Sequence, residues 1–352
     1  MIPALNVRKA RRYLRRITSL VSSLAVASYF VTFAKAGVYV TSSELTSAKM
    51  PPAAPPDGPI THQLALWNAH GVTLKNYPQL WYSPMNLSPM VAGADPTEGV
   101  WTPIGTDAGP GYATFETFVT PYAGGPRVSV AWINQDYAKV QMFAGTSQPG
   151  GTWPYEGSIP QSLWPKLIGA FEGGFIFNQS NGGWYADGRY GIPLVQGAAS
   201  VVSYSNGTID IGSWGNEVSM TSAVTGVRQN LIPLVDNGQV VAAANQNPLV
   251  TWGFSLGNLL NTWRSGLGIT SSGALIYVGG PGLSPANLGS ILVWAGAVRG
   301  MQLDMNPYWV NYVQYNYGQS GLQGTDLLPN MNLGPSHYLN GFWRDFLAVF
   351  LR

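Results

Sequence analysis

Alternating apolar and polar positions recur in the second half of the chain, and each alternating run is interrupted by a residue pair that ends in glycine. Three runs share this pattern: residues 202–211 around Asn206-Gly207, residues 231–241 around Asn237-Gly238, and residues 268–278 around Ser272-Gly273. A period of two is typical of a strand with one buried face, and Asn-Gly accepts the positive φ angles of a tight turn. The pattern therefore predicts three β-hairpins, and residues 128–143 predict one or two further strands.

A capped helix is expected directly after the last hairpin. Ser284 precedes Pro285, and apolar residues then recur every three to four positions from Leu288 to Ala295. Because serine satisfies the first helical amides and proline suits the first turn, we expect a helix over residues 286–298 that packs on a sheet. The apolar residues 301–303 predict the next strand, a parallel neighbour to which the helix returns the chain. A second, short helix is expected over residues 161–168.

These elements predict an α/β fold of the mixed α+β kind, with large, strand-rich, twisted sheets and a few packing helices. The composition agrees, because 43 glycines, 26 prolines and 12% aromatic residues favour strands and turns. Only 10% of the residues are charged, which argues against a coiled coil or a helical bundle. No fixed-period repeat and no second linker appears after residue 60, so we expect a single domain over residues 61–352.

The beginning of the chain has the features of an export segment. Residues 17–33 carry no charge, six basic residues precede them, and Ala34-Lys35-Ala36 follows. This order matches a signal peptide, although an uncharged stretch of 17 residues also approaches the length of a membrane span. We therefore expect residues 1–36 to be a signal peptide or a membrane anchor, residues 37–60 to be a Pro-rich linker, and the protein to be secreted or membrane-anchored outside the cytoplasm.

Charge and residue usage exclude several classes of function. The net charge is +2, but without residues 1–36 the chain has 11 basic and 16 acidic residues and no cluster of cations. Nucleic acid is therefore not an expected partner.

There is no cysteine, which excludes disulfides, thiolate catalysis and Cys-ligated zinc. The three histidines form no metal-binding pattern, so no metal or other cofactor is expected.

Charged residues in apolar surroundings are the candidates for chemistry. Asp304 follows the predicted strand 300–303, and ligands of α/β sheets gather at the carboxyl ends of strands, although an Asx turn explains the aspartate equally well. Arg264 lies in a strand-like segment, where it could clamp a phosphate, stack on Trp263 or pair with a structural acid. Glu172 precedes Gly173-Gly174, a pair that permits either the close approach of a ligand or a tight turn.

Several ordered motifs resemble those of the phosphodiester glycosidase family related to the mannose-6-phosphate uncovering enzyme. Residues 170–176 are similar to the family's Ala-hydrophobic-Asn-Gly-Gly-Phe-Phe, residues 264–278 to its Arg-Thr-Ala-hydrophobic-Gly hairpin, and residues 301–304 to its strand ending in Asn-Leu-Asp. The chain departs from the family in two places. Glu172 replaces the asparagine before Gly-Gly, and Met305-Asn306-Pro307 replaces the glycine run after the aspartate.

The resemblance implies an exported hydrolase that cleaves a sugar-1-phosphodiester in an envelope or extracellular glycan and needs no cofactor. Asp304 would act as acid/base or nucleophile, and Glu172 would be the second carboxylate of a glycosidase-like pair. The substrate-binding residues implied are Arg264, Gly173, Gly174 and Asn306. The expected partners are the carbohydrate phosphodiester and, if residues 1–36 are retained, a membrane.

The alternative is a non-catalytic envelope protein that binds glycans on an aromatic surface. The chain has 13 tryptophans and 18 tyrosines, and aromatic faces stack on sugars. Several of them follow Asp304 or the Gly-Gly pair: Trp309, Tyr312, Tyr315, Tyr317 and Trp184-Tyr185. Most aromatic residues in such positions belong to a sheet core. An amide in place of Asp304 distinguishes the two hypotheses, because a binding protein tolerates it and an enzyme does not.

Overall fold

The computed structural model describes residues 84–108, 111–246 and 248–352. All of these residues belong to one compact unit. The predicted export segment (1–36), the predicted linker (37–60) and residues 61–83 lie outside the described residues, so these predictions and the single-domain prediction stay predictions.

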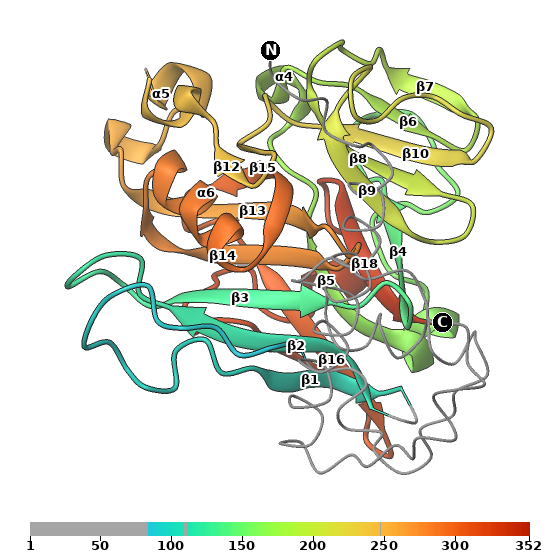
Figure 1. The fold of residues 1–352 in the computed structure, drawn as a ribbon. Helices are drawn as coiled ribbons and strands as arrows, with labels where there is room; N and C mark the ends of the chain where they lie inside the picture. The colour runs from blue at the N-terminus through green and yellow to red at the C-terminus, as the bar shows by residue number, and fades with distance from the viewer. Residues whose placement is uncertain (1–83, 109–110, 247) are drawn as a thin grey trace, which may run out of the picture. The chain divides into compact units, whose positions relative to one another are not determined.

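Three antiparallel sheets make up most of the described chain (Figure 1). The eight-stranded sheet has the order β1 (Thr102–Asp107), β2 (Tyr112–Val119), β3 (Val128–Ile133), β14 (Leu275–Leu283), β13 (Thr262–Thr270), β15 (Ala297–Met305), β11 (Val235–Asp236) and β12 (Gln239–Val240). The β10 sheet has the order β7 (Arg189–Ile192), β6 (Trp184–Ala186), β10 (Val224–Gln229), β8 (Ala199–Tyr204) and β9 (Ile209–Ser213). The β5 sheet has the order β17 (Gly321–Asp326), β16 (Tyr312–Gly318), β5 (Leu167–Glu172), β18 (Phe346–Leu351) and β4 (Ala138–Phe143).

Helices are few and short. They are α4 (Phe177–Ser180), α5 (Pro248–Thr251), α6 (Pro285–Trp294) and the 3-10 helices η2 (Gln161–Lys166), η3 (Ala242–Asn245), η4 (Leu256–Asn258) and η5 (His337–Leu339). Within the described residues, no helix has the length and apolar composition needed to cross a membrane. The expected strand-rich character is confirmed, and the fold is mixed but mainly β.

The three predicted hairpins are present, because their turns depend on local sequence. β8 pairs with β9, β11 with β12, and β13 with β14, each in antiparallel register across the expected glycine. Residues 128–143 form the two strands β3 and β4. These strands belong to different sheets, a separation that the local pattern does not predict.

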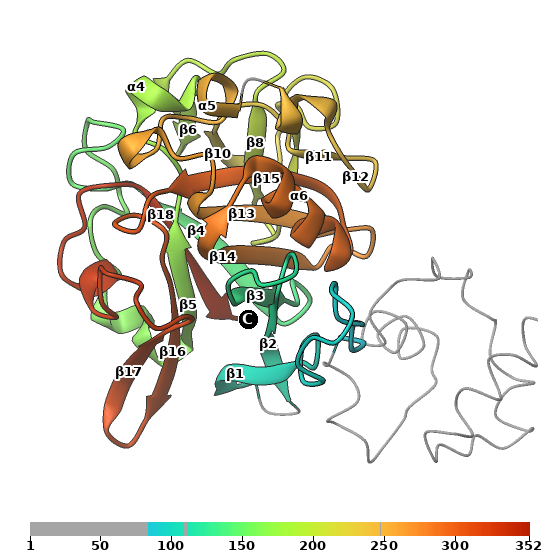
Figure 2. The ribbon, with the colours of Figure 1, turned by 90° about the vertical axis from the view of Figure 1, so that its left-hand side faces the viewer.

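Helix α6 begins where the sequence predicts and ends earlier. The Ser284 hydroxyl accepts a hydrogen bond from the Asn287 amide (3.1 Å), and Pro285 occupies the first turn. The helix ends at Trp294, and Gly296, with a φ of +95°, leads into β15. The buried side of α6 packs on β13, β14 and β15, as Figure 2 shows for β13 and β14.

The expected neighbour of β15 is wrong, and the second expected helix is present but shorter than predicted. β15 runs parallel to β14 but is not its neighbour, because β13 lies between them and pairs antiparallel with both. The hairpin partner β14 occupies one edge of β13, so only the other edge is open to β15. The short helix expected over residues 161–168 is the 3-10 helix η2, which contains Pro165 and ends at Lys166. Proline removes a backbone donor, and the next residues enter β5.

Two large cores lie on the two faces of the eight-stranded sheet. One core packs α6 against the sheet and includes Leu288, Ile291 and Val278. The other core is shared by all three sheets and includes Leu303, Val201 and Phe171. The shared core fixes the ends of β5, β10 and β15 beside one another, and the candidate site is built at those ends.

The cap of α6 gives a test of the fold. Ser284→Ala removes the side-chain acceptor of the Asn287 amide, so we expect the free energy of unfolding to fall by about 1 kcal/mol. Denaturant unfolding followed by circular dichroism measures this change. The matched control is Ser271→Ala in the exposed β13–β14 turn, which should leave stability within about 0.5 kcal/mol. Equal effects of the two substitutions would contradict the capping role.

Candidate active site

A β-bulge in β15 sets the direction of Asp304. Gly266 pairs with Gln302 and Arg264 pairs with Met305, so β15 contains one residue more than β13 over this interval. The side chains of Gln302 and Met305 both reach the Arg264 guanidinium and therefore lie on one face. In a regular strand, residues three apart point to opposite faces. The bulge therefore turns Asp304 away from Arg264, toward the core shared by the three sheets.

Asn230, directly after β10, holds this bulge in place. Its amide nitrogen donates to the carbonyl oxygens of Gln302 and Leu303, both at 2.9 Å. Its side-chain oxygen accepts from the Phe175 amide at 3.1 Å. Asn230 is fully buried. This one side chain therefore joins β15 to the glycine segment that follows Glu172.

Glu172 is the last residue of β5 and lies buried among neutral hydrogen-bond donors. Its carboxyl group accepts from the Ser265 hydroxyl, from the Asn311 amide (3.1 Å) and from the Tyr277 hydroxyl (3.2 and 3.3 Å to the two oxygens). Burial raises the pKa of Glu172 to about 8, and the Asp304 charge adds to the increase, while the hydrogen bond from Ser265 opposes it. Glu172 is therefore predominantly protonated at neutral pH.

Ser265 connects the Glu172 carboxyl group to the backbone of Asp304, the two acids predicted from the sequence. Its hydroxyl donates to Glu172 and accepts from the backbone amide of Asp304 at 3.1 Å. The structure thus brings Asp304 and Glu172, which are far apart in sequence, to opposite sides of one hydroxyl group.

Two buried ion pairs complete the cluster, and both arginines were absent from the sequence-based candidates. Arg344 donates to Asp304 and to the Gly174 carbonyl oxygen (2.6 Å). Arg228 donates from two nitrogens to the two oxygens of Asp345, at 2.8 and 3.2 Å. Burial raises the pKa of Asp304, whereas the Arg344 guanidinium lowers it in part.

The charges of the cluster balance. Two guanidinium groups face two aspartates, and in the part of the chain that the structure describes no cation pairs with Glu172. A neutral Glu172 is consistent with this balance. The site therefore offers a proton donor (Glu172), a carboxylate (Asp304) and two anion-binding groups (Arg228 and Arg344) within one buried region. Such a combination suits general acid catalysis next to a negatively charged leaving group.

The two glycines after Glu172 permit the cluster to pack closely. A Cβ at Gly173 would lie 2.0 Å from an Asp345 carboxylate oxygen. Gly174 has a φ of +133°, and a Cβ there would lie 3.0 Å from the Asn230 side-chain oxygen. Close packing of charged side chains on this backbone accounts for both glycines, and their contact with a substrate stays a prediction.

Arg264 lies on the other face of the eight-stranded sheet and is fully buried. Its guanidinium donates to the Gln302 side chain (2.8 Å) and to three carbonyl oxygens, those of Leu283 (2.9 Å), Trp252 (3.3 Å) and Leu260 (3.3 Å). Burial lowers its pKa to about 10. These contacts join β13 to its surroundings and do not reach the carboxylates, so phosphate binding by Arg264 stays a prediction.

Asn306 forms the turn directly after Asp304 and Met305. It has a φ of +76°, its backbone amide donates to the Trp263 carbonyl (2.9 Å), and its side-chain oxygen accepts from the Leu256 amide (2.9 Å). Half-buried, it fixes the loop beside the site, and its contact with a substrate also stays a prediction.

An aromatic pair packs against the buried Arg344. The guanidinium carbon lies 4.7 Å from the ring centre of Trp309 and 5.7 Å from that of Trp343. The two indole rings meet edge to face. Because Trp343 is 38% exposed, this pair connects the buried ion pair to the surface.

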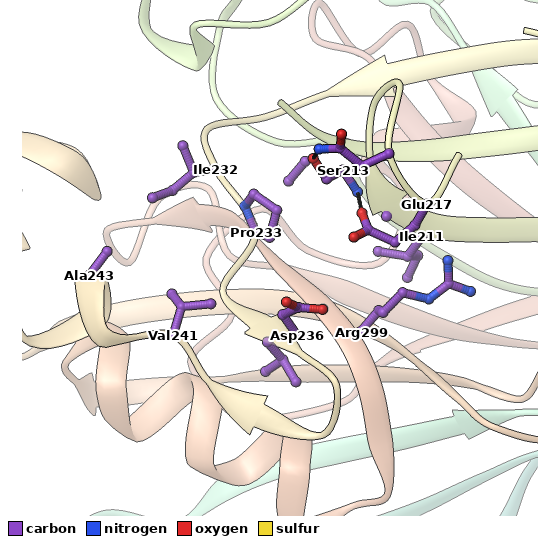
Figure 3. Close-up of a pocket in the computed structure, with 14 residues that line it drawn as sticks. Ile211, Ser213, Glu217, Ile232, Pro233, Asp236, Val241, Ala243 and Arg299 are labelled. Carbon is purple, nitrogen blue, oxygen red and sulfur yellow. Dashed lines mark hydrogen bonds between the residues drawn. The ribbon is translucent and has the colours of Figure 1, made fainter. Parts of the chain in front are cut away.

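Two cavities lie apart from these carboxylates. One, of about 310 Å³, is lined by Ile232, Val241, Asp236, Glu217 and Arg299 among others, and Figure 3 shows it beside β9 and β11. The other, of about 330 Å³, lies along β4, β6 and β8. Neither includes Glu172, Asp304 or Asp345 in its lining. Across the described ranges, no group of three or more side chains has the composition of a metal site.

Comparison with solved structures finds distant similarities. The chain is similar to the catalytic domain of zebrafish N-acetylglucosamine-1-phosphodiester alpha-N-acetylglucosaminidase, auto-inhibited by its pro-peptide, with 14% identity, coverage of 78% of this chain and 97% of that chain, and a TM-score of 0.44. It is also similar to a hypothetical protein from Synechocystis (14% identity, 68% and 62% coverage, TM-score 0.37). A third similarity is to a Burkholderia pseudomallei protein described as an inferred exported protein (11% identity, 66% and 74% coverage, TM-score 0.30).

No family model and no curated protein sequence matches the chain. The similarities to solved structures concern the path of the backbone. The roles of individual residues in this chain are therefore argued from its own contacts.

The raised pKa of Glu172 predicts a pH dependence of stability. The carboxyl group binds its proton up to pH 8 in the folded state and up to about pH 4.5 when unfolded. Its stabilising contribution is therefore complete below pH 4.5 and is lost as the pH rises to 8, with a slope of up to about 1.4 kcal/mol per pH unit. Glu172→Gln keeps the shape of the neutral group and should remove this loss. Denaturant unfolding of parent and variant between pH 5 and 9 checks it, and curves that stay parallel would contradict the assignment.

The contacts of Arg264 predict that its main role is structural. Arg264→Lys keeps the charge but cannot satisfy four acceptors spread around a planar guanidinium. We expect the free energy of unfolding to fall by about 2 kcal/mol or more. Thermal unfolding and activity should be measured together. Unchanged stability with a selective loss of activity on a phosphodiester would favour the substrate-binding role predicted from the sequence.

Proposed function

We propose that this protein is a hydrolase that cleaves a sugar-1-phosphodiester bond, with Glu172 and Asp304 as its two carboxyl groups. One observation carries the proposal: Ser265 joins a carboxyl group that keeps its proton at neutral pH to the backbone amide of Asp304, whose own carboxylate is paired with an arginine. In acid/base sites, two neighbouring acids typically lie in environments that give them different pKa values, so that one is protonated while the other is ionised. The resemblance of residues 170–176, 264–278 and 301–304 to the phosphodiester glycosidase family supports the same reaction class.

The proposed reaction breaks the bond between the anomeric carbon and the phosphate oxygen. The electron pair leaves with the phosphate monoester, Glu172 supplies a proton to the departing oxygen, and water supplies the new anomeric hydroxyl group. Asp304 either attacks the anomeric carbon or removes a proton from the attacking water. Arg344 and Arg228 stabilise the charge of the departing phosphate, because guanidinium groups bind phosphate oxygens through paired hydrogen bonds.

The aromatic pair gives the sugar a place to bind. The partly exposed Trp343, with Trp309 behind it, packs on Arg344, so a sugar ring stacked on the indole would bring its anomeric phosphate toward the guanidinium. An extracytoplasmic location belongs to the same proposal and rests on residues 1–36.

The second candidate function is glycan binding without catalysis. It is favoured by the engagement of Asp304, which is only 1% exposed and already bonded to Arg344. In this case the ion pair would only position Arg344 and the two tryptophans for a bound sugar phosphate.

Asp304→Asn distinguishes the two candidates. The amide preserves size and most hydrogen bonding but removes the charge and the capacity for proton transfer, so the enzyme should lose about 10²–10⁴-fold in turnover while still binding its substrate. The purified full-length chain is screened against sugar-1-phosphodiesters and ordinary glycosides, and the variant is then compared on the substrate that is cleaved.

Asp187→Asn is the matched control, because this aspartate lies exposed in the β6–β7 turn with a φ of +50°, which asparagine tolerates. Near-native turnover of Asp304→Asn on a confirmed substrate would place the chemistry elsewhere. Measurable glycan binding without cleavage by the parent chain would favour the non-catalytic candidate.

A further inference from the structure

An unusually apolar surface lies between β12 and β13. No charged residue occurs between Asp236 and Arg264. Five large apolar side chains in this interval are exposed: Val250 (74%), Phe254 (70%), Leu256 (59%), Leu259 (58%) and Leu260 (46%). We name residues 250–260 the apolar loop. Single exposed apolar residues are common on proteins, but a cluster of this kind marks an interaction surface.

The loop is fixed to the protein by its other residues. Trp252 is fully buried, and its indole nitrogen donates to the Ala243 carbonyl at 3.0 Å. The Ser255 hydroxyl donates to the Leu259 carbonyl at 2.6 Å, which closes the turn around η4. Figures 1 and 2 both show α5, at the start of the loop, above β13 and β14. The apolar side chains are therefore presented outward from an anchored backbone.

The loop is also attached to the end of β15, the strand that carries Asp304. Its Leu256 amide donates to Asn306, in the turn directly after Asp304 and Met305. Gly253, with a φ of +88°, packs so tightly that a Cβ there would come within 2.8 Å of Phe175 and 3.0 Å of Met305. The Trp252 carbonyl accepts from Arg264 and Gln302. The loop is therefore fixed to the end of β15 that carries Asp304, and its contacts lie on the α6 face of the sheet.

We propose that the apolar loop inserts into the surface of a lipid bilayer. Phenylalanine, leucine and valine gain free energy on leaving water, and the interval holds no charge that would have to be dehydrated on entering the interface. The other exposed residues of the loop are Gly257 and Asn258, which are small and uncharged and suit the headgroup region. The absence of charge also leaves nothing to form the salt bridges that orient a protein partner.

The sequence before the described residues points to the same occupant. Residues 17–33 form an apolar segment preceded by six basic residues, an order that directs a chain to a membrane whether or not the segment is removed. A loop that enters the interface would then hold the domain against the bilayer. Resting on the proposed function, this placement also assigns the substrate class, a glycosyl phosphodiester whose second ester group is a lipid.

The chain has no cysteine, so a single introduced cysteine can report on the loop. The full-length variant Leu259→Cys carries an environment-sensitive fluorophore and is mixed with vesicles of phosphatidylcholine and phosphatidylglycerol, with and without spin-labelled lipid. We expect a blue shift of the emission and quenching by the spin label. The same fluorophore at Val195→Cys, an exposed apolar position before β8, should show neither effect even if an N-terminal anchor holds the chain on the vesicle.

Other outcomes overturn the proposal in distinguishable ways. Equal spectra with and without vesicles at position 259 would show that the loop stays in water. A blue shift that needs no vesicle and grows with protein concentration would assign the loop to a second copy of the chain. If the loop inserts but the protein cleaves no diester, the insertion proposal stands and only the proposed function is overturned.

A second pair of variants tests the substrate class. Phe254→Ser combined with Leu259→Ser should lower activity on a lipid-borne sugar phosphodiester in vesicles about tenfold or more, and leave activity on a short soluble analogue unchanged. The control combines Val195→Ser with Met220→Ser, two exposed apolar positions elsewhere. Equal losses on both substrates would overturn the lipid assignment.

Discussion

The buried charge cluster is the constraint on which the rest of the structure depends. Its members come from all three sheets: Asp304 from β15, Arg228 from β10, Glu172 from β5, and Arg344 and Asp345 from the segment before β18. Removing one partner of a buried ion pair costs about 3–5 kcal/mol, because the other charge is left uncompensated. The three sheets must therefore meet in one arrangement. Apolar residues of similar size would often stabilise a fold as well as such pairs do, so stability alone does not account for the cost of burying these charges.

The bulge in β15 shows how the fold directs these charges. One extra residue changes the face of the sheet to which the Asp304 side chain points. Asn230 stabilises this bulge by donating hydrogen bonds to the carbonyl oxygens of Gln302 and Leu303. The same shift leaves Gln302 and Met305 with Arg264 on the α6 face. Two arginines that neighbour β15 are thus separated by the sheet: Arg344 contacts Asp304, and Arg264 contacts neutral oxygens.

Local sequence features predict the parts of this structure that depend on a few neighbouring residues. The Asn-Gly and Ser-Gly turns and the Ser284 cap act within short segments, and these elements appear as expected. The position of β15 depends instead on which edge of β13 is open after β14 has paired, and the hairpin pattern does not contain that information.

Asp304 and Glu172 stand out in the sequence because charges are scarce. Arg228 and Arg344 do not, since their partners lie 117 and 40 residues away and are brought together only by the shared core. The Arg344-Asp345 pair directly before the apolar run 346–350 was the available signal.

Under the proposed function, the Arg344–Asp304 ion pair couples substrate binding to activation. In the free protein burial raises the pKa of Asp304, and the Arg344 guanidinium that holds it opposes part of this increase and lowers its basicity. A phosphate that binds Arg344 competes with Asp304 for the same guanidinium, and phosphate provides the same kind of acceptor. Once released, the buried carboxylate loses its compensating charge and becomes a stronger base and nucleophile. Glu172 stays protonated meanwhile, because its hydrogen bonds come from neutral groups that the phosphate does not displace. Binding of the substrate phosphate therefore frees Asp304 from Arg344 and makes it reactive. Water that enters without a phosphate meets an Asp304 that is still paired and less reactive.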